Sequence, residues 1–251
     1  MTIALDRNLV LEGENLSLLP RLPGGAFDMI YIDPPFNTGR VQSLRGGSYP
    51  DTFADLPAFL RPRLEEARRL LADHGTLYVH PDPRQAHHVK VMLDELFGRE
   101  CFLNEIVWAY DYGGRPKRRW PAKHDTILVY VKDRAQYWFD DDEVDREPYM
   151  APGLVGPEKA ARGKRPSDVW WHTIVTTTGR ERTGYPTQKP EGIVRRMVTA
   201  SSRPGGWCLD FFAGSGTLGA VCEQLGRRYV LIDENPEAIA VARARLSSDA
   251  A

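Results

Sequence analysis

A carboxylate, two prolines and an aromatic ring stand in one row at Asp33-Pro34-Pro35-Phe36. The row directly follows an apolar run over residues 27–32 that is typical of a buried strand. Consecutive prolines cannot continue a sheet ladder, and they hold the backbone in a stiff, extended turn. We therefore expect Asp33 and Phe36 to be held rigidly at the carboxyl edge of a sheet, where α/β proteins place their sites.

This row fits methyl transfer to the amino group of a planar base. Such an amine is a weak nucleophile because its lone pair is delocalised into the ring. The Asp33 carboxylate and the Pro34 carbonyl can accept the two amino hydrogens, draw the nitrogen toward tetrahedral geometry and free its lone pair for attack on a sulfonium methyl. Phe36 can stack on a base that has been flipped out of its helix. By itself, the row fits a structural turn with a capping carboxylate equally well.

A second stretch can hold a ligand. Residues 209–217 have the pattern of a strand that enters a glycine turn and then a helix. Glycines let backbone approach a ligand closely, and a helix N-terminus offers unpaired N–H groups to an anion. Asp233 ends the next apolar run, where an acidic side chain would bind ribose hydroxyls. The pattern predicts an adenosine-containing cofactor.

The type of cofactor is not decided by the glycines alone. Gly214, Gly216 and Gly219 also satisfy the dinucleotide pattern G-x-G-x-x-G, which leaves a nicotinamide oxidoreductase open. Two features count against that alternative. Only one predicted strand and one predicted helix follow the loop, so N-terminal residues must complete the half-fold. A site for hydride transfer also does not require the Asp-Pro-Pro-Phe motif at residues 33–36.

The elements that must position these residues alternate along the chain. Strands are predicted over residues 8–11, 27–32, 76–80, 102–108, 126–131, 207–211 and 229–232. Helices are predicted over residues 60–72, 86–97, 191–200, 217–225 and 236–246. Short apolar runs of this kind are typical of buried parallel strands. The alternation predicts a doubly wound α/β fold with a mainly parallel sheet.

Composition limits the class of protein. The 251 residues can build one substantial core, and 42% hydrophobic with 27% charged residues is ordinary for a soluble globular protein. No apolar stretch approaches the roughly 20 residues of a membrane span, and the N-terminus lacks a secretion signal. Cys101, Cys208 and Cys222 match no metal spacing, the histidines form no ligand pattern, and direct methyl transfer needs no metal. We expect a cytoplasmic, nucleoid-associated protein.

Because the motif at residues 33–36 precedes the glycine loop at residues 209–217, the chain resembles the β group of DNA amino-methyltransferases, which are circularly permuted. In that family an Asp/Ser-Pro-Pro-aromatic motif precedes the cofactor loop. The resemblance covers nearly the whole chain and implies a Rossmann-like S-adenosylmethionine-dependent methyltransferase fold. Two positions depart from the family pattern: Glu14 stands where Asp is usual, and Phe212 where Pro is more common.

The resemblance also assigns site residues. The catalytic residues would be Asp33, Pro34, Pro35 and Phe36. The residues that bind S-adenosylmethionine would be Glu14, Asn15, Asp33, Thr187, Gln188, Lys189, Asp210, Phe211, Phe212, Ala213, Gly214, Ser215, Gly216, Thr217 and Asp233. Adenine at its 6-amino group is the expected target, because Ser leads the motif more often in enzymes that methylate cytosine at its 4-amino group.

The pattern of alternating elements fails between about residues 109 and 187, apart from the predicted strand at 126–131. We expect residues 1–108 and 187–251 to be the catalytic and cofactor halves, and 109–186 to be a target-recognition insert. The net charge is −1, yet basic residues crowd into a short part of the insert. The residues expected to contact DNA are Asn37, Arg115, Lys117, Arg118, Arg119, Trp120, Lys123, Arg180, Arg182 and Tyr185. A solvated surface is the alternative for each of them singly.

Three other functions stay open on the sequence. The first is methylation of cytosine, RNA or a protein amide, since related motifs serve those substrates. The second is a DNA-binding module without turnover, and the third is the nicotinamide oxidoreductase. The expected partner is double-stranded DNA, with a homodimer and a cognate restriction endonuclease as further candidates.

Overall fold

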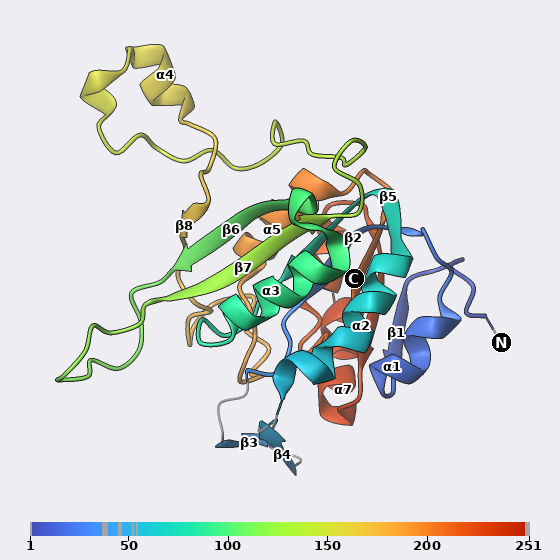
Figure 1. The fold of residues 1–251 in the computed structure, drawn as a ribbon. Helices are drawn as coiled ribbons and strands as arrows, with labels where there is room; N and C mark the ends of the chain where they lie inside the picture. The colour runs from blue at the N-terminus through green and yellow to red at the C-terminus, as the bar shows by residue number, and fades with distance from the viewer. Residues whose placement is uncertain (1, 37–39, 45–46, 52, 54, 249–251) are drawn as a thin grey trace.

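An eight-stranded sheet forms the centre of the computed structural model, which describes residues 2–36, 40–44, 47–51, 53 and 55–248 (Figure 1). Its strands are β1 (Leu9–Glu12), β2 (Phe27–Ile32), β5 (Leu71–Val79), β6 (Phe102–Ala109), β7 (His124–Val131), β8 (Val169–Trp171), β9 (Trp207–Asp210) and β10 (Arg228–Asp233). They lie in the order β1-β10-β9-β2-β5-β7-β6-β8. A separate antiparallel pair is formed by β3 (Arg40–Leu44) and β4 (Gly47–Asp51).

Helices cover both faces of this sheet. They are α1 (Asn15–Leu18), α2 (Leu56–Leu70), α3 (Ala86–Phe97), α4 (Pro157–Arg162), α5 (Glu191–Ser201), α6 (Thr217–Gln224) and α7 (Pro236–Ser248), with short 3₁₀ turns at Leu19–Arg21, Arg99–Cys101 and Pro152–Leu154. Alternate residues of β2 point to opposite faces. Ile30 and Ile32 pack in the same core as α2 and α3, whereas Met29 and Tyr31 pack in the core of α5 and α6. The predicted doubly wound α/β fold is confirmed.

The two ends of the chain build one sheet. The last strands are inserted beside the first, because β9 pairs in parallel with β2 through Met29↔Cys208 and Ile30↔Leu209. On its other edge, β2 pairs in parallel with β5. N-terminal residues therefore complete the cofactor half, as the short stretch after the glycine loop predicts.

One predicted strand direction was wrong. The strands β1, β10, β9, β2 and β5 are parallel, but β7 runs antiparallel to both β5 and β6. A buried apolar run looks the same in either direction, so the sequence of β7 did not reveal this. The boundary after α2 also differs: the helix ends at Leu70, and Leu71 pairs with Phe27 as the first residue of β5.

Part of the predicted insert joins the sheet. β8 pairs in parallel with β6, with Trp170 beside Trp108. The segment that carries α4 projects away from the sheet (Figure 1), and a two-way backbone pair between Glu147 and Lys164 closes its root. No helix in the described ranges is both long enough and apolar enough to span a membrane.

Candidate active site

The row that begins at Asp33 lies where the sequence predicts it, immediately after β2 at the carboxyl edge of the sheet. Pro34 is buried, and Pro35 and Phe36 are partly exposed. The adjacent strand end supports the turn, because the His80 N–H donates to the Ile32 carbonyl at 2.9 Å. We call residues 33–36 the catalytic turn.

One lysine contacts both functional groups of the catalytic turn. Lys189 Nζ lies 2.9 Å from Asp33 Oδ1 and 4.4 Å from the centroid of the Phe36 ring. The Lys189 side chain is 10% exposed and that of Asp33 is 16% exposed, so their ion pair is shielded from solvent. A base amine on Asp33 and a base ring on Phe36 would use the same two partners as this ammonium group.

The glycine loop is held by two carboxylates. Asp233 Oδ2 accepts from the Gly214 N–H at 2.8 Å, and Asp233 Oδ1 accepts from the Asn235 N–H at 2.9 Å. Asp210 Oδ1 accepts from the Phe212 N–H at 2.9 Å. Burial raises the pKa of both carboxyl groups above the usual range, although these backbone hydrogen bonds oppose the rise. Asp33 and Asp233, both nearby, raise the pKa of Asp210 further.

Glycine is required at the end of the loop. Gly216 has a φ of 72° at the N-cap of α6, in the left-handed region that favours glycine. A Cβ there would also lie 2.9 Å from Ala242 Cβ in α7. The remaining side chains of the loop face inward: Phe211, Ala213, Ser215 and Thr217 are buried, and Phe212 is partly buried against the ring of Phe59, 6.3 Å between centroids.

Glu14 and Asn15, the two N-terminal residues predicted to bind the cofactor, form hydrogen bonds within the protein. Glu14 caps α1 by accepting from the Ser17 N–H at 2.7 Å, and its other oxygen accepts from Arg63 Nη2 at 2.7 Å. Asn15 Oδ1 accepts from Arg63 Nε, and Asn15 Nδ2 donates to the Phe211 carbonyl at 2.9 Å. Asn15 thus links the segment after β1 to the cofactor loop, and Arg63 of α2 holds both Glu14 and Asn15 in place. Nothing in the sequence singled Arg63 out, because its partners are about 50 residues away.

The segment before α5 is tied to the cofactor loop. Thr217 Oγ1 donates to the Lys189 carbonyl at 3.2 Å. The Gln188 side chain holds the residues before it in a turn. It accepts from the Thr183 N–H at 2.8 Å and donates to the Glu181 carbonyl at 2.6 Å. Thr187 is exposed. The structure therefore brings Lys189, the catalytic turn and the glycine loop together, while Gln188 shapes the chain that leads to them.

The residues predicted to contact DNA fall into separate places. Residues 110–123 form a loop between β6 and β7, which we call the basic loop (Figure 1). Its cluster of exposed side chains consists of Arg115, Lys117, Arg118, Arg119 and Trp120, the last 94% exposed. Lys123 is partly buried and donates to the Gly113 carbonyl at 2.8 Å. Asn37 lies outside the described residues.

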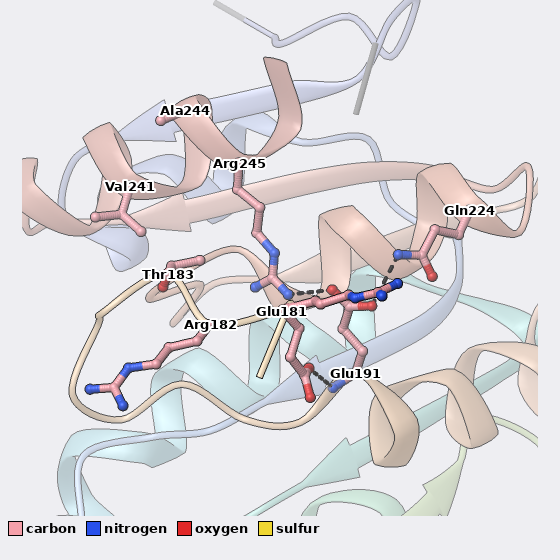
Figure 2. A pocket seen from close by; sticks show the side chains of 9 residues that line it. Glu181, Arg182, Thr183, Glu191, Gln224, Val241, Ala244 and Arg245 are labelled. Carbon is pink, nitrogen blue, oxygen red and sulfur yellow. Dashed lines mark hydrogen bonds and ion pairs between the residues drawn. The ribbon is translucent and has the colours of Figure 1, made fainter. Parts of the chain in front are cut away.

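Arg180 and Arg182 lie elsewhere, over α6 and α7. Together with Glu181, Glu191 and Arg245 they line a cavity of about 590 Å³, in which Arg245 is paired with Glu191 (Figure 2). Tyr185 lies beside the cofactor loop, since a Cβ on Gly214 would meet its ring at 3.4 Å. These three residues are thus gathered near the cofactor half and not on the basic loop.

Beside the catalytic turn lies a cluster of polar side chains that the sequence did not assign to the site. It joins Tyr31, His80, Tyr110 and Asp125, which come from four strand ends. One sequence signal could have found His80: like Asp33, it follows directly on an apolar run and is succeeded by a proline.

Comparison with known proteins identifies the family. Residues 27–244 match the family described as DNA methylase, so the chain belongs to the DNA methylases that modify N6 or N4 amino groups. It is similar to the type II methyltransferase M.HpaI of Haemophilus parainfluenzae, with 33% identity over 98% of this chain and 76% of that protein. It is also 31% identical to the DNA adenine methyltransferase YhdJ of Escherichia coli (strain K12), over 96% of this chain and 83% of that protein.

Solved structures support the same fold. The PvuII DNA methyltransferase (cytosine-N4-specific) superposes with a TM-score of 0.73 at 15% identity, covering 96% of this chain and 90% of that one. The M1.HpyAVI–SAM complex superposes with a TM-score of 0.66 at 20% identity, covering 95% of this chain and 98% of that one. At these identities the likeness establishes the Rossmann-like methyltransferase fold alone.

S-adenosylmethionine is the cofactor of this family, and the residues present fit it. A side chain at Gly214 would enter the space beside the Tyr185 ring and meet that ring at 3.4 Å, so the glycine keeps the loop backbone open on that side. Asp233 stands at the end of β10, where a carboxylate can accept from ribose hydroxyls. Lys189, beside the loop rather than within it, would be the cation for the carboxylate of the methionine part.

Proposed function

We propose that this chain transfers a methyl group from S-adenosylmethionine to the 6-amino group of an adenine that has been flipped out of double-stranded DNA. The observation that carries the proposal is the position of Asp33 and Phe36. A carboxylate and an aromatic ring are fixed on a rigid turn, next to the glycine loop and in contact with Lys189. Two further features, the Asp that leads the turn and a relative named as an adenine methyltransferase, favour adenine over cytosine.

The protein's part in the reaction follows from these groups. Asp33 and the Pro34 carbonyl accept the two amino hydrogens, which localises the lone pair on the nitrogen. Phe36 stacks on the ring and holds the nitrogen in line. The cofactor supplies an electrophilic methyl carbon on its sulfonium. The nitrogen would take this methyl group, the electron pair of the broken carbon–sulfur bond would remain on sulfur, and the Asp33 carboxylate would accept the proton that the nitrogen loses.

Lys189 has two uses in this scheme. Its ammonium can serve the cofactor carboxylate, and it neutralises Asp33 in the partly buried site. Because the base would use the carboxylate and the ring that Lys189 contacts, we propose that Lys189 shifts when the base binds. A short lysine displacement is compatible with its flexible stem.

The DNA-reading surface is proposed to be the insert at residues 109–186, with the basic loop as its electrostatic part. Its exposed arginines and lysines suit contacts to phosphates, and Trp120 suits stacking or wedging. Residues 1–108 and 187–251 would then be the catalytic and cofactor halves. Because M.HpaI is named a type II methyltransferase, we also propose a cognate restriction endonuclease and, from the resemblance, a homodimer.

Incubation of the purified protein with labelled S-adenosylmethionine and plasmid DNA, followed by nucleoside analysis, tests the function. The expected product is N6-methyladenine. N4-methylcytosine alone would establish the alternative DNA specificity, and label in RNA alone would refute DNA as the substrate. Calorimetry with S-adenosylhomocysteine and with NAD separates the methyltransferase from the oxidoreductase alternative, and we expect binding of the former only.

A further inference from the structure

Four polar side chains meet below the catalytic turn. His80 Nδ1 lies 3.0 Å from Tyr31 Oη, and His80 Nε2 lies 3.4 Å from Asp125 Oδ2. The other Asp125 oxygen accepts from the Tyr110 hydroxyl at 2.9 Å. His80 is fully buried, Tyr31 is 2% exposed and Asp125 is 9% exposed. Buried groups of this kind destabilise a core unless they are paired, so their presence needs a reason.

The pairing of His80 is incomplete. Its distance to Asp125 exceeds the 2.7–2.9 Å of a good charge-assisted hydrogen bond. His80 Nε2 has no closer hydrogen-bond partner in the part of the chain that the structure describes. A loosely satisfied buried histidine beside a carboxylate, at the edge of the sheet that carries the active site, is typical of a functional position.

His80 also packs against the aromatic rings of the site. Its ring centroid lies 6.4 Å from that of Phe36 and 5.7 Å, edge to face, from that of Trp108. Phe36 is the ring proposed to stack on the base, and Lys189 covers it from 4.4 Å. The orientation of the imidazole therefore bears directly on where the Phe36 ring can lie.

The same group reaches the root of the basic loop. Tyr110 follows the last residue of β6, and Asp125 is the second residue of β7. Between them, the Tyr110 N–H donates to the Lys123 carbonyl at 2.9 Å and closes the loop. Contacts thus run from the basic loop through Tyr110, Asp125 and His80 to Phe36.

We propose that His80 is a positioning residue for the target base: held by Tyr31 and Asp125, it sets the orientation of Phe36 and links it to the root of the basic loop. The proposal rests on the function proposed above for the catalytic turn. Burial raises the pKa of Asp125, but the neighbouring His80, the charge of Lys189 and the Tyr110 hydroxyl together bring that pKa below the usual value.

The molecule contains a matched control. His74 Nε2 lies 3.0 Å from Asp28 Oδ1, so a second His–Asp pair joins β5 to β2. His80 stands just past the carboxyl end of β5, whereas His74 and Asp28 lie near the amino ends of the two strands, away from the catalytic turn. Replacing either histidine removes a His–Asp pair that joins β5 to a neighbouring strand, but only the pair of His80 lies beside the catalytic turn.

The test compares His80→Phe, Asp125→Asn and His74→Phe in the full chain. Steady-state methylation of plasmid DNA gives kcat and KM, calorimetry gives the affinity for S-adenosylhomocysteine, and thermal melting gives stability. For His80→Phe and Asp125→Asn we expect kcat to fall about 10- to 100-fold, as when a reacting group is misplaced by a fraction of an ångström to an ångström. We expect KM for DNA and affinity for S-adenosylhomocysteine to stay within about twofold.

His74→Phe should lower the melting temperature while leaving kcat within about twofold of wild type. His80→Gln, which keeps a polar group near Asp125, should recover part of the kcat lost in His80→Phe. Tyr110→Phe should lower kcat by about 3- to 10-fold, because it removes one hydrogen bond to Asp125 while leaving His80 in place. If His80→Phe does not fold, Asp125→Asn and Tyr110→Phe decide the question.

The proposal is overturned if kcat falls only in step with the melting temperature across all variants, or if Asp125→Asn methylates like wild type. A wild-type protein that methylates no DNA would instead refute the proposed function on which this inference rests. The two failures are therefore distinguishable.

Discussion

The catalytic turn and the basic loop are built in opposite ways. Asp33 and Phe36 are partly buried, share Lys189 and rest on a parallel sheet whose neighbouring strands come from both ends of the chain. The basic side chains at residues 115–119 are exposed to solvent on a loop that is closed at its root by the hydrogen bond from the Tyr110 N–H to the Lys123 carbonyl. The chemistry requires groups that are preorganised before the base arrives. Phosphate contact tolerates mobile side chains, because the attraction is long-ranged and carries no sequence information.

This difference predicts that variants in the two regions fail separately. Changes at the sheet edge should alter turnover or stability and leave the electrostatics of DNA binding intact. Changes on the basic loop should do the reverse.

The largest effect is expected for Asp33→Ala. It removes the acceptor that activates the amine, so methylation should fall by at least about 10²- to 10³-fold. Binding of S-adenosylhomocysteine should largely survive, because the glycine loop is intact. Calorimetry and a plasmid methylation assay measure the two quantities. Normal turnover in this variant would refute the role of Asp33.

Lys189→Met should lower stability, because it leaves the Asp33 carboxylate without its cation. Removing one partner of a buried pair costs about 3–5 kcal/mol; since both side chains retain some exposure, we expect about 1–3 kcal/mol here. The double variant Asp33→Asn with Lys189→Met should recover much of the loss, because no uncompensated charge remains. Chemical denaturation measures both. A double variant less stable than Lys189→Met would contradict a stabilising ion pair between Asp33 and Lys189.

Changing Arg118 and Arg119 together to Ala should weaken binding to all DNA sequences and leave the melting temperature unchanged. If each arginine neutralises one phosphate, the slope of log K against log salt becomes less steep by about 2. Fluorescence anisotropy over a series of salt concentrations gives this slope. An unchanged slope would remove both residues from the phosphate-contacting surface.

The smallest effect is expected for Asp210→Asn. Burial raises the pKa of Asp210 in the folded protein above its unfolded value, so the protonated form favours folding and this contribution is lost as pH rises through the folded pKa. Asn keeps the acceptor for the Phe212 N–H without the charge. The variant should therefore melt a few degrees higher than wild type at pH 8, with a smaller gap at pH 5. An advantage that grows toward acid pH would contradict the assignment.

Local patterns predicted the parts of the fold that depend on neighbours in sequence. The bounds of β2 and α3 agree with prediction, since an apolar run and a helical period are each complete within one element. The direction of β7 and the pairing of β8 with β6 depend on partners chosen in three dimensions, and no local pattern encodes them.

The candidate site shows the same division. Asp33 and the glycine loop were visible because proline and glycine constrain the backbone where they stand. The group of Tyr31, His80 and Asp125 was not, because it joins residues 45–94 positions apart through the sheet order β2-β5-β7. Lys189 was assigned to the cofactor from the resemblance, but its contact with Asp33 required the fold.

Base-resolution mapping of methylated positions in genomic DNA tests the central claim most directly. The DNA would come from cells that express either the wild-type chain or Asp33→Ala. We predict N6-methyladenine within one recurring short sequence for the wild type and none at that sequence for the variant. Methylation confined to cytosine, or adenine methylation that persists without Asp33, would contradict the account.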